Sequence, residues 1–401
     1  MKKITTIVRK AALIGLLALV SACTADEELT TEQAAPIELM NYVAGYKATK
    51  ASGASKASMA SMASMASMPS MALVAPTPPA WVPAGFSQDE SGSHPAIGVF
   101  LTQDGEEPIA AKIYYASDKK WRIKDLPENF GTYYFYGYVP KDAATTSIAP
   151  NGTYSDGAVL TLEGLGPVSG KDVCIVVGAK DGTSASTVEG LEVGQFAVNV
   201  KSGGGTDNEN FLFVLYDHLY AAIKFQFKVE PTYAELRTIK IKTLEMTVYT
   251  DNEFTTKMKE SITNTITLTK NGRSPMVDEA DYQADPSPVT ETPSGEDMDS
   301  VRFFHSEDEP VELNSSEWRG NMISYVTKNL KYFVLRTTFD VYDSKGHLTR
   351  QDCVAENKVD AEEYLGALKR GYMYTLKFTV NPTYLYMLSE YDLDNPTIKL
   401  E

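Results

Sequence analysis

Hydrophobic and polar residues alternate with a period of two along most of the chain after residue 96, which is typical of β-strands with one buried face. The clearest case is residues 223–229 (IKFQFKV), where apolar side chains take one face and lysine or glutamine the other. Residues 239–248 show the same alternation with a change of parity, so we predict a β-bulge near Thr243. The other predicted strands are 97–101, 111–116, 132–139, 158–162, 173–179, 196–200, 211–216, 262–268, 322–327, 332–341, 348–354 and 372–380.

This succession of short strands predicts an all-β protein. Gly, Asn, Asp and Pro separate the strands, as hairpins and meanders require, so we expect antiparallel β-sandwiches. A chain of 401 residues exceeds the length of one sandwich. We therefore predict an N-terminal β-sandwich domain over residues 37–250 and a C-terminal one over residues 251–401. The acidic segment 278–309 is predicted to be an exposed loop, and residues 362–369 to form one or two helical turns.

Residues 1–22 are interpreted as a lipoprotein signal peptide. Lys2 and Lys3 precede the apolar run AALIGLLALV, which suits a signal-peptide core and is too short to span a bilayer. The run ends in VSAC (residues 20–23), which looks like a bacterial lipobox. We therefore expect cleavage before Cys23, lipidation of its thiol with acyl chains such as palmitate, and anchoring to the outer membrane. The alternative is an ordinary secretory signal followed by a chance cysteine.

The next segments are predicted to include a single strand. Residues 23–36 form an acidic tether that resembles the surface-export signal of Bacteroidetes lipoproteins, although a solvated linker is an alternative. Ile37 to Tyr46 (IELMNYVAGY) is a candidate strand. About residues 51–92 form a low-complexity Ala/Ser/Met/Pro segment in which ASM repeats four times, a pattern with nothing to bury in a core. An insertion without function explains that repeat most simply.

Charge and the scarcity of metal ligands argue against several functions. The chain carries 53 acidic and 37 basic side chains, a net charge of −16, so nucleic acid is a poor partner. The histidines have no zinc-ligand spacing, and HExxH, CxxC, Gly-x-Ser-x-Gly and P-loop patterns are missing. We therefore expect no enzyme, no catalytic or cofactor-binding residue and no metal site. His218 is interpreted as a structural histidine and Cys174 as an inert core thiol, and a Cys174–Cys353 disulfide is left open.

The C-terminal segment stands out because strand-like patterning continues beyond the strand at 372–380. Pro382 interrupts the pattern, and two further short apolar runs follow at 383–388 and 395–400. An extended tail of this length (382–401) could pair with the open edge of a sheet in another molecule. It could equally fold back onto its own domain, and the pattern alone does not separate the two.

A set of segments spread over most of the chain forms a recognisable combination: the lipobox, IELMNYVAGYKATKA, IGVF, YYFYGYVP, FLFVLYDHLYAAIKFQFKV, IKIKTLEMTV and RGYMYTLKFTVNPTYLY. Together they resemble the fimbrillin (Mfa-like) family of Bacteroidetes fimbrial subunits, the type V pilins. The resemblance implies two tandem transthyretin-like β-sandwiches, export as a lipoprotein and polymerisation with other fimbrial subunits by strand exchange. In that family a trypsin-like protease removes the first strand of the N-terminal domain, and the C-terminal strand of a neighbouring subunit fills the groove.

Carried over to this sequence, the removable strand would be Ile37 to Tyr46. The cut would follow Lys47, Lys50 or Lys56. The donor strand would lie within Thr383 to Leu400, with the candidate residues Tyr384, Leu385, Tyr386, Met387, Leu388, Ile398 and Leu400.

One feature departs from the family pattern. Family members are often cut after arginine, but no arginine occurs between Arg9 and Arg122. Either a lysine serves as the cut site, or the subunit keeps its first strand and anchors the fibre, so shaft and anchor roles both remain open.

The resemblance implies a structural subunit, shaft or anchor, of a cell-surface fimbria that supports adhesion or biofilm formation and needs no cofactor. An alternative from another class is a surface glycan-binding lipoprotein. Trp81, Trp121 and Trp318, together with the many tyrosines, would supply aromatic sugar platforms in that case.

Overall fold

The computed structural model describes residues 34–48, 81–83, 94–117, 120–127, 129–182, 191–201, 211–272, 289–306, 309–385 and 390–400. The predicted signal peptide and most of the tether and of the low-complexity segment lie outside these residues, as do Cys23, Lys50, Lys56 and the donor candidates Tyr386, Met387 and Leu388. None of the helices within these ranges is long and apolar enough to cross a membrane.

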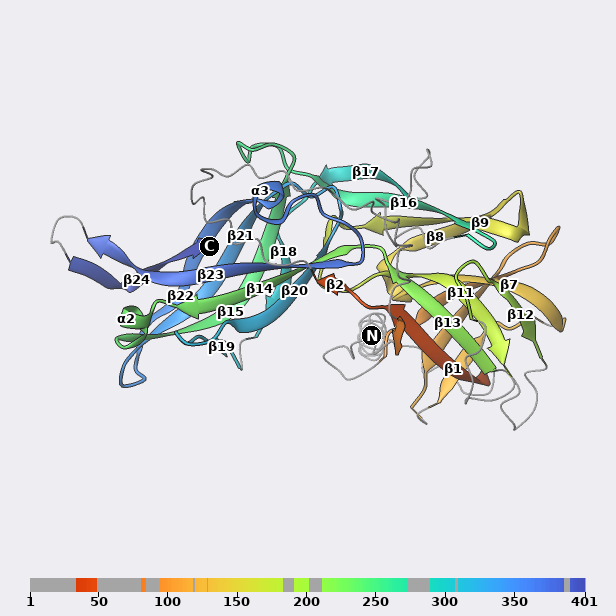
Figure 1. Ribbon diagram of the computed structural model, residues 1–401, viewed down its shortest axis with the longest axis horizontal. Coiled ribbons are helices and arrows are strands. Elements are labelled where there is room, and N and C mark those ends of the chain that lie inside the picture. The colour runs from red at the N-terminus through yellow and green to blue at the C-terminus, as the bar shows by residue number, and fades with distance from the viewer. Residues whose placement is uncertain are drawn as a thin grey trace, which may run out of the picture.

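The described chain is built almost wholly from strands, so the all-β prediction is confirmed. Two sheets make up one end of the molecule (Figure 1). The nine-stranded sheet holds β1 (Ala34–Ala44), β3 (Trp81–Pro83), β4 (Ile97–Thr102), β5 (Ile109–Tyr115), β6 (Trp121–Lys124), β7 (Gly131–Val139), β11 (Cys174–Gly182), β12 (Ala197–Val200) and β13 (Phe211–His218). The four-stranded sheet covers it with β8 (Thr145–Asn151), β9 (Thr153–Leu165), β16 (Lys259–Thr269) and β17 (Val289–Asp297).

The other end of the molecule contains two further sheets. The six-stranded sheet holds β2 (Lys47–Ala48), β10 (Val168–Ser169), β14 (Ala221–Val229), β20 (Arg319–Val326), β23 (Tyr372–Leu385) and β24 (Glu390–Leu400). The five-stranded sheet holds β15 (Arg237–Tyr249), β18 (Val301–His305), β19 (Val311–Glu312), β21 (Tyr332–Asp343) and β22 (Leu348–Asp360). Short helical turns occur at η2 (Lys141–Ala143), α2 (Pro231–Ala234) and α3 (Ala361–Leu365).

Three hydrophobic clusters hold the sheets together. One lies within the nine-stranded sheet, whose pairings form a closed ring in the order β11, β13, β1, β6, β5, β4 and β7, because β7 pairs again with β11. A second lies between that ring and the four-stranded sheet, and a third between the six- and five-stranded sheets. The ring depends on every member strand, since losing one opens two edges.

Alternation along single strands explains how these clusters form. In β14, Ile223, Phe225 and Phe227 are fully buried while the residues between them are half-buried, as predicted. In β15 the register against β21 shifts between Ile241 and Thr243, so the predicted β-bulge is confirmed. The bulge keeps the apolar residues on both sides of it facing one core.

The structure differs from the predicted loop over 278–309, because β17 and β18 lie within it. Strand β17 is an edge strand on β16, and it is held by Val289 (3% exposed) and by Met298 just after it (1% exposed). Its residues Glu296 and Asp297 are exposed, as suits an edge, whereas the Glu291 side chain is buried.

The division into domains 37–250 and 251–401 remains a prediction. Three of the sheets contain strands from both predicted domains. Strands β14 and β15, from the first range, pair with β20, β21 and β23 of the second. Strand β16, from the second range, pairs with β9 of the first. The chain therefore passes more than once between the two ends of the molecule.

Candidate functional site

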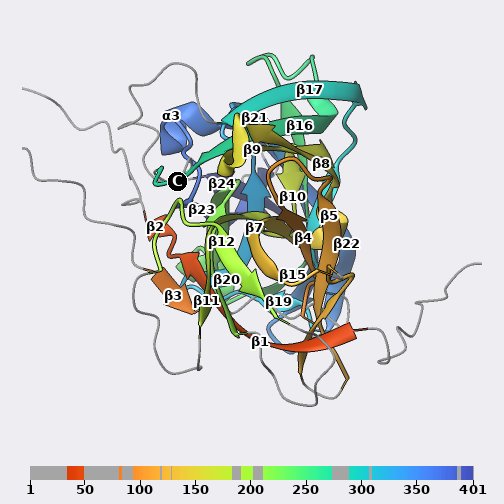
Figure 2. The same ribbon diagram turned by 90° about the vertical axis from the view of Figure 1, so that its right-hand side faces the viewer.

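Strand β1 closes the ring of the nine-stranded sheet. Residues Glu38 to Val43 run parallel to Phe211 to Tyr216 of β13, and Ala34 to Ile37 run antiparallel to β6. Strand β3 adds a short antiparallel pairing near Ala44. Figure 2 shows β1 running along the lower side of the molecule. Strand β1 lies between β6 and β13. Without β1, the edges of these two strands that face it would present unpaired N–H and C=O groups.

The inner face of β1 fills an apolar groove. Ala35 and Ile37 are 8% and 5% exposed, and Leu39 and Val43 pack against the same cluster. Burial of a side chain such as Ile37 contributes about 1.5–3 kcal/mol. The strand predicted over 37–46 is therefore present as β1, shifted slightly toward the N-terminus. An apolar pocket beside Ile37 is lined by Leu101, Ile123, Leu126, Phe135 and Leu212.

The C-terminal tail forms a hairpin with its own sheet. Strand β24 runs antiparallel to β23, with Tyr391 opposite Tyr384. Ile398 is 5% exposed, Leu400 packs against the core of the two C-terminal sheets, and the Asn357 side-chain amide donates a hydrogen bond to the Ile398 carbonyl (2.6 Å). Of the two alternatives for the tail, the structure shows the one in which it folds back.

Strand β24 is nevertheless an edge strand, and in the described part of the chain it pairs with β23 alone. The hairpin extends from the end of the molecule that lies opposite β1 (Figure 1). The predicted donor residues divide between its two strands, with Tyr384 and Leu385 in β23 and Ile398 and Leu400 in β24. Release of an edge strand breaks only the ladder between that strand and its one neighbour.

Lys47, the one candidate cut site among the described residues, lies in β2. Its N–H donates to the Gly371 carbonyl (3.0 Å), and its Nζ lies 5.3 Å from the centroid of the Tyr372 ring. Proteases prefer exposed loops, so a cut after Lys47 would require β2 to leave β23. Processing at Lys47, Lys50 or Lys56 remains a prediction.

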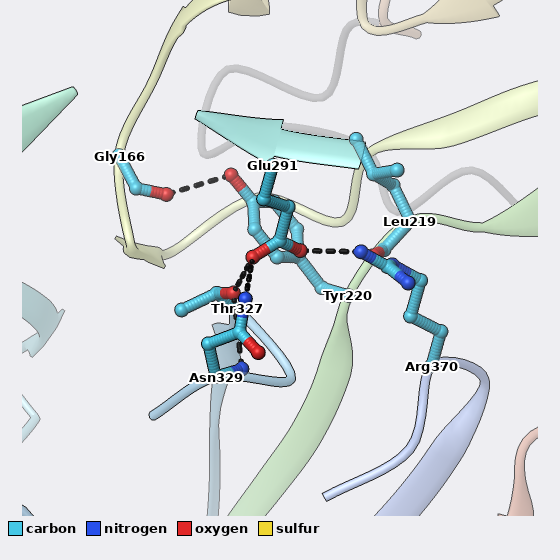
Figure 3. Close-up of polar contacts among 7 residues, drawn as sticks. All are labelled: Gly166, Leu219, Tyr220, Glu291, Thr327, Asn329 and Arg370. Carbon is cyan, nitrogen blue, oxygen red and sulfur yellow. Dashed lines mark hydrogen bonds and ion pairs between the residues drawn. The ribbon is translucent and has the colours of Figure 1, made fainter. Parts of the chain in front are cut away.

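Glu291 on β17 lies in a buried polar network where the sheets of the two ends meet (Figure 3). Its Oε2 accepts hydrogen bonds from Thr327 Oγ1 (2.5 Å) and Asn329 Nδ2 (2.7 Å). Arg370 Nη2 donates to Glu291 Oε1, and Arg370 Nε donates to the Leu219 carbonyl (3.0 Å). The side chains of Arg370 and Glu291 are 0% and 6% exposed.

This network joins four distant parts of the chain. Glu291 belongs to the four-stranded sheet, whereas Arg370 precedes β23 of the six-stranded sheet. Beside them the Tyr220 hydroxyl donates to the Gly166 carbonyl (2.8 Å). Burial, followed by the charge of Glu291, raises the pKa of Tyr220, so the phenol stays neutral. The network thus fixes one end of the molecule against the other.

A second buried polar cluster lies next to the end of β1. Cys174 and His218 are opposite each other on the antiparallel strands β11 and β13, and Asp172 is two residues before Cys174. His218 Nδ1 lies 2.8 Å from Asp172 Oδ2 and 3.5 Å from Cys174 Sγ. His218 Nε2 lies 2.7 Å from the Ala44 carbonyl, and the Tyr46 ring stacks on the imidazole at 3.8 Å between centroids.

Charge and burial shift the protonation of this cluster in different directions. Burial lowers the pKa of His218, but the charge and hydrogen bond of Asp172, with Asp217 and the Ala44 carbonyl, outweigh it, so the pKa is raised overall. Burial raises the pKa of the Cys174 thiol well above its usual value. Cys174 and Cys353 are both free, so the disulfide left open by the sequence is not formed.

No protein-family model matches the chain, and no curated protein does. Among solved structures it is similar to a "putative cell adhesion protein" of Bacteroides fragilis NCTC 9343 (11% identity, TM-score 0.38, 91% of this chain and 97% of that one). It is also similar to a fimbrial protein of Bacteroides vulgatus ATCC 8482 (10% identity, TM-score 0.29, 78% of this chain and 92% of that one). A third similar structure is the fimbrial anchor protein Mfa2 of Porphyromonas gingivalis (9% identity, TM-score 0.24, 90% of this chain and 97% of that one).

These neighbours are fimbrial and adhesion proteins, the class named by the sequence resemblance. Their TM-scores lie below 0.5 and their identities near 10%, so they carry no argument about what this chain does. Its function has to follow from its own contacts.

The tryptophans considered for sugar binding lie in different segments of the chain. Trp81 lies in β3 and Trp121 in β6, where the Trp121 ring contacts Tyr115 at 5.3 Å between centroids. Trp318 precedes β20, and the ammonium groups of Lys228 and Lys377 lie 4.4 and 5.0 Å from its ring centroid. Sugar binding through a shared aromatic platform gains no specific support from this arrangement.

Sequence reasoning missed the Asp172–Cys174–His218 cluster. It treated Cys174 and His218 as separate core residues, because their proximity depends on strand register. A usable signal was present in Asp172-Val173-Cys174, since alternate residues of an extended segment share a face. A histidine two residues after the strand predicted over 211–216 was the second part of that signal.

Proposed function

We propose that this protein is a structural subunit of a cell-surface fimbria that assembles by exchange of β-strands. The observation that carries the proposal is the position of β1, a strand from the start of the chain that closes a ring between β13 and β6. Its departure would leave two open edges and an apolar groove, which another extended segment can fill.

The C-terminal hairpin supplies a candidate segment to fill that groove. Strand β24 pairs on one side only, and its apolar residues Ile398 and Leu400 alternate with polar ones. Once β1 has been removed from a second copy, release of β24 breaks one antiparallel ladder, and its insertion between β6 and β13 of that copy would form two. Such an exchange favours the polymer because the number of strand pairings rises.

The location we propose follows from the sequence. Lipidation at Cys23 would anchor the chain to the outer membrane, and acidic residues behind it would direct it to the cell surface. There the polymer would support adhesion or biofilm formation. The proposed role is structural, with other fimbrial subunits as partners and without catalysis or a cofactor.

The test uses the folded chain with a cleavage site for a specific protease placed within residues 51–80. After the cut, β1 is held by non-covalent contacts only, and a labelled peptide of residues 382–401 is added. We expect the peptide to replace the β1 fragment, as a peptide of residues 34–48 does in the positive control. The matched control peptide carries Ile398→Asp and Leu400→Asp, and we expect it not to bind.

The outcomes separate the parts of the proposal. Binding of residues 34–48 without binding of residues 382–401 would contradict donation by the tail. Fibre formation by the processed chain, seen by electron microscopy, should also disappear when residues 382–401 are deleted. Unchanged fibres after that deletion would reject strand exchange through the tail.

A further inference from the structure

Asp172, Cys174 and His218 bring three different metal-binding atoms together on one side of two paired strands. These atoms all lie within 4.8 Å of one another. The cross-strand pairing of Cys174 with His218 fixes two of them, and Asp172 lies two residues before Cys174, just ahead of β11. A carboxylate, a thiolate and an imidazole are the ligand types that zinc takes in proteins.

The histidine is oriented as a metal ligand. Its Nε2 lies 2.7 Å from the Ala44 carbonyl, which can only accept, so Nε2 carries a proton. Nδ1 is the atom that faces Asp172 and Cys174, and without an ion its N–H donates to Asp172 Oδ2 (2.8 Å). Loss of that proton would free the Nδ1 lone pair for a metal ion at the same position. A backbone carbonyl that fixes the tautomer of a ligand histidine is the usual second partner in metal sites.

The distances suit a tetrahedral ion. Zinc bonds of about 2.0 Å to nitrogen and about 2.3 Å to sulfur place the two ligand atoms about 3.5 Å apart. His218 Nδ1 and Cys174 Sγ are 3.5 Å apart. The separation of 2.8 Å between Nδ1 and Asp172 Oδ2 is somewhat shorter, and a small rotation of the carboxylate would open it to accommodate the ion.

Two further polar oxygens border this cluster. Asp172 Oδ1 and the Tyr46 hydroxyl are both buried without a hydrogen-bond partner. Buried polar atoms are nearly always satisfied, so each such atom calls for an explanation. Burial, followed by the charges of Asp172, Cys174 and Tyr325 and by an interaction of the hydroxyl with the Asp172 carboxylate, raises the pKa of Tyr46 well above its usual value, so its hydroxyl is neutral.

We propose that Asp172, Cys174 and His218 bind one zinc ion, with the Tyr46 hydroxyl or a water molecule as the fourth ligand. The Cys174 thiol and His218 Nδ1 each lose a proton to solvent when the Zn–S and Zn–N bonds form, and Asp172 contributes its carboxylate. The Asp172 side chain is 22% exposed, which provides a path for the ion from solvent. Because Ala44 is the last residue of β1 and Tyr46 follows shortly after it, the ion would join the end of that strand to β11 and β13.

The experiment uses the chain from residue 23 onward with Cys23→Ser in every sample, so that no thiol of the predicted lipidation site competes. Calorimetric titration with zinc chloride should give one ion per chain. Titration with Co²⁺ should give the strong near-ultraviolet absorption of a cobalt–thiolate bond. Cys174→Ser should abolish that absorption, and Cys174→Ser, His218→Gln and Asp172→Asn should each weaken zinc binding about 100-fold or more.

Matched controls come from the same chain. Cys353→Ser removes the other described cysteine, and His347→Gln removes an exposed histidine whose Nδ1 lies 3.1 Å from Asp343. Both variants should bind zinc as the parent chain does. Equal zinc binding by Cys174→Ser and by the parent chain would overturn the proposal.

The parent chain alone also tests the site, which matters where a core variant fails to fold. If Co²⁺ produces no cobalt–thiolate absorption in the folded parent chain, Cys174 is not a ligand and the proposal is wrong. Tyr46→Phe then distinguishes the fourth ligand. A weakening of about 10-fold or more assigns the phenol, and unchanged affinity assigns water.

Discussion

At the scale of single residues, the buried network around Glu291 shows how a few polar atoms can decide the stability of a junction. The carboxylate receives hydrogen bonds from Arg370, Thr327 and Asn329, and water is excluded from the arginine. Removing one partner of such a pair leaves a charge that is buried and uncompensated. The loss of stability therefore comes from the buried charge that remains as well as from the hydrogen bond that is lost.

We predict that Arg370→Met lowers the free energy of unfolding by about 3–5 kcal/mol, because Glu291 would remain buried without its cation. Urea denaturation followed by circular dichroism measures the change. The control is Arg302→Met, whose partner is Glu245 at 2.9 Å and whose side chain is 54% exposed. Arg302→Met should lower the free energy of unfolding by less than about 1 kcal/mol. Equal losses in the two variants would contradict the prediction.

At the scale of elements, the sequence predicted most strands because a period of two is a local property. The strand over 223–229 and the bulge near Thr243 are both present. The sequence did not predict which strands pair with one another. Three of the described pairings are parallel, β1 with β13, β14 with β23 and β2 with β23, and no local pattern distinguishes a parallel neighbour from an antiparallel one.

Candidate sites were predictable only where they consist of one segment. The first strand and the tail are continuous stretches, and the sequence located both. The cluster of Asp172, Cys174 and His218 and the network of Glu291 and Arg370 each join residues from distant segments. Their formation depends on strand register and sheet order, which alternation of apolar residues does not encode.

We predict that Ile37→Asp detaches β1 while the rest of the molecule stays folded. The carboxylate would enter an apolar groove without a partner, and burial of an unpaired charge is strongly unfavourable. Hydrogen exchange measured by mass spectrometry should then accelerate in β6 and β13 and remain unchanged in β22. The matched control is Glu38→Ala, on the exposed side of the same strand, which should leave exchange in β6 and β13 as it is.

At the scale of the whole molecule, the two ends are linked by more than a single connection. Strand β2 follows β1 and pairs with β23, Tyr325 of β20 packs against the cluster beneath the four-stranded sheet, and Val168 belongs to the cluster of the C-terminal sheets. The buried pair of Glu291 and Arg370 adds a polar connection. Cores that are joined through the same strands are expected to lose their structure together.

We predict that the chain unfolds in one thermal transition. Differential scanning calorimetry should give a ratio of calorimetric to van't Hoff enthalpy close to one. Two resolved transitions in the parent chain would show that the ends unfold independently. Arg370→Met, which removes the polar connection, should broaden the transition or split it.

The parallel pairing of β1 with β13 has a directional consequence for any polymer built as proposed. A replacement strand that preserves this ladder has to enter with the same heading as β1. The hairpin of β23 and β24 lies at the far end of the long axis (Figure 1). Every copy would then share one orientation, giving a filament whose two tips differ chemically.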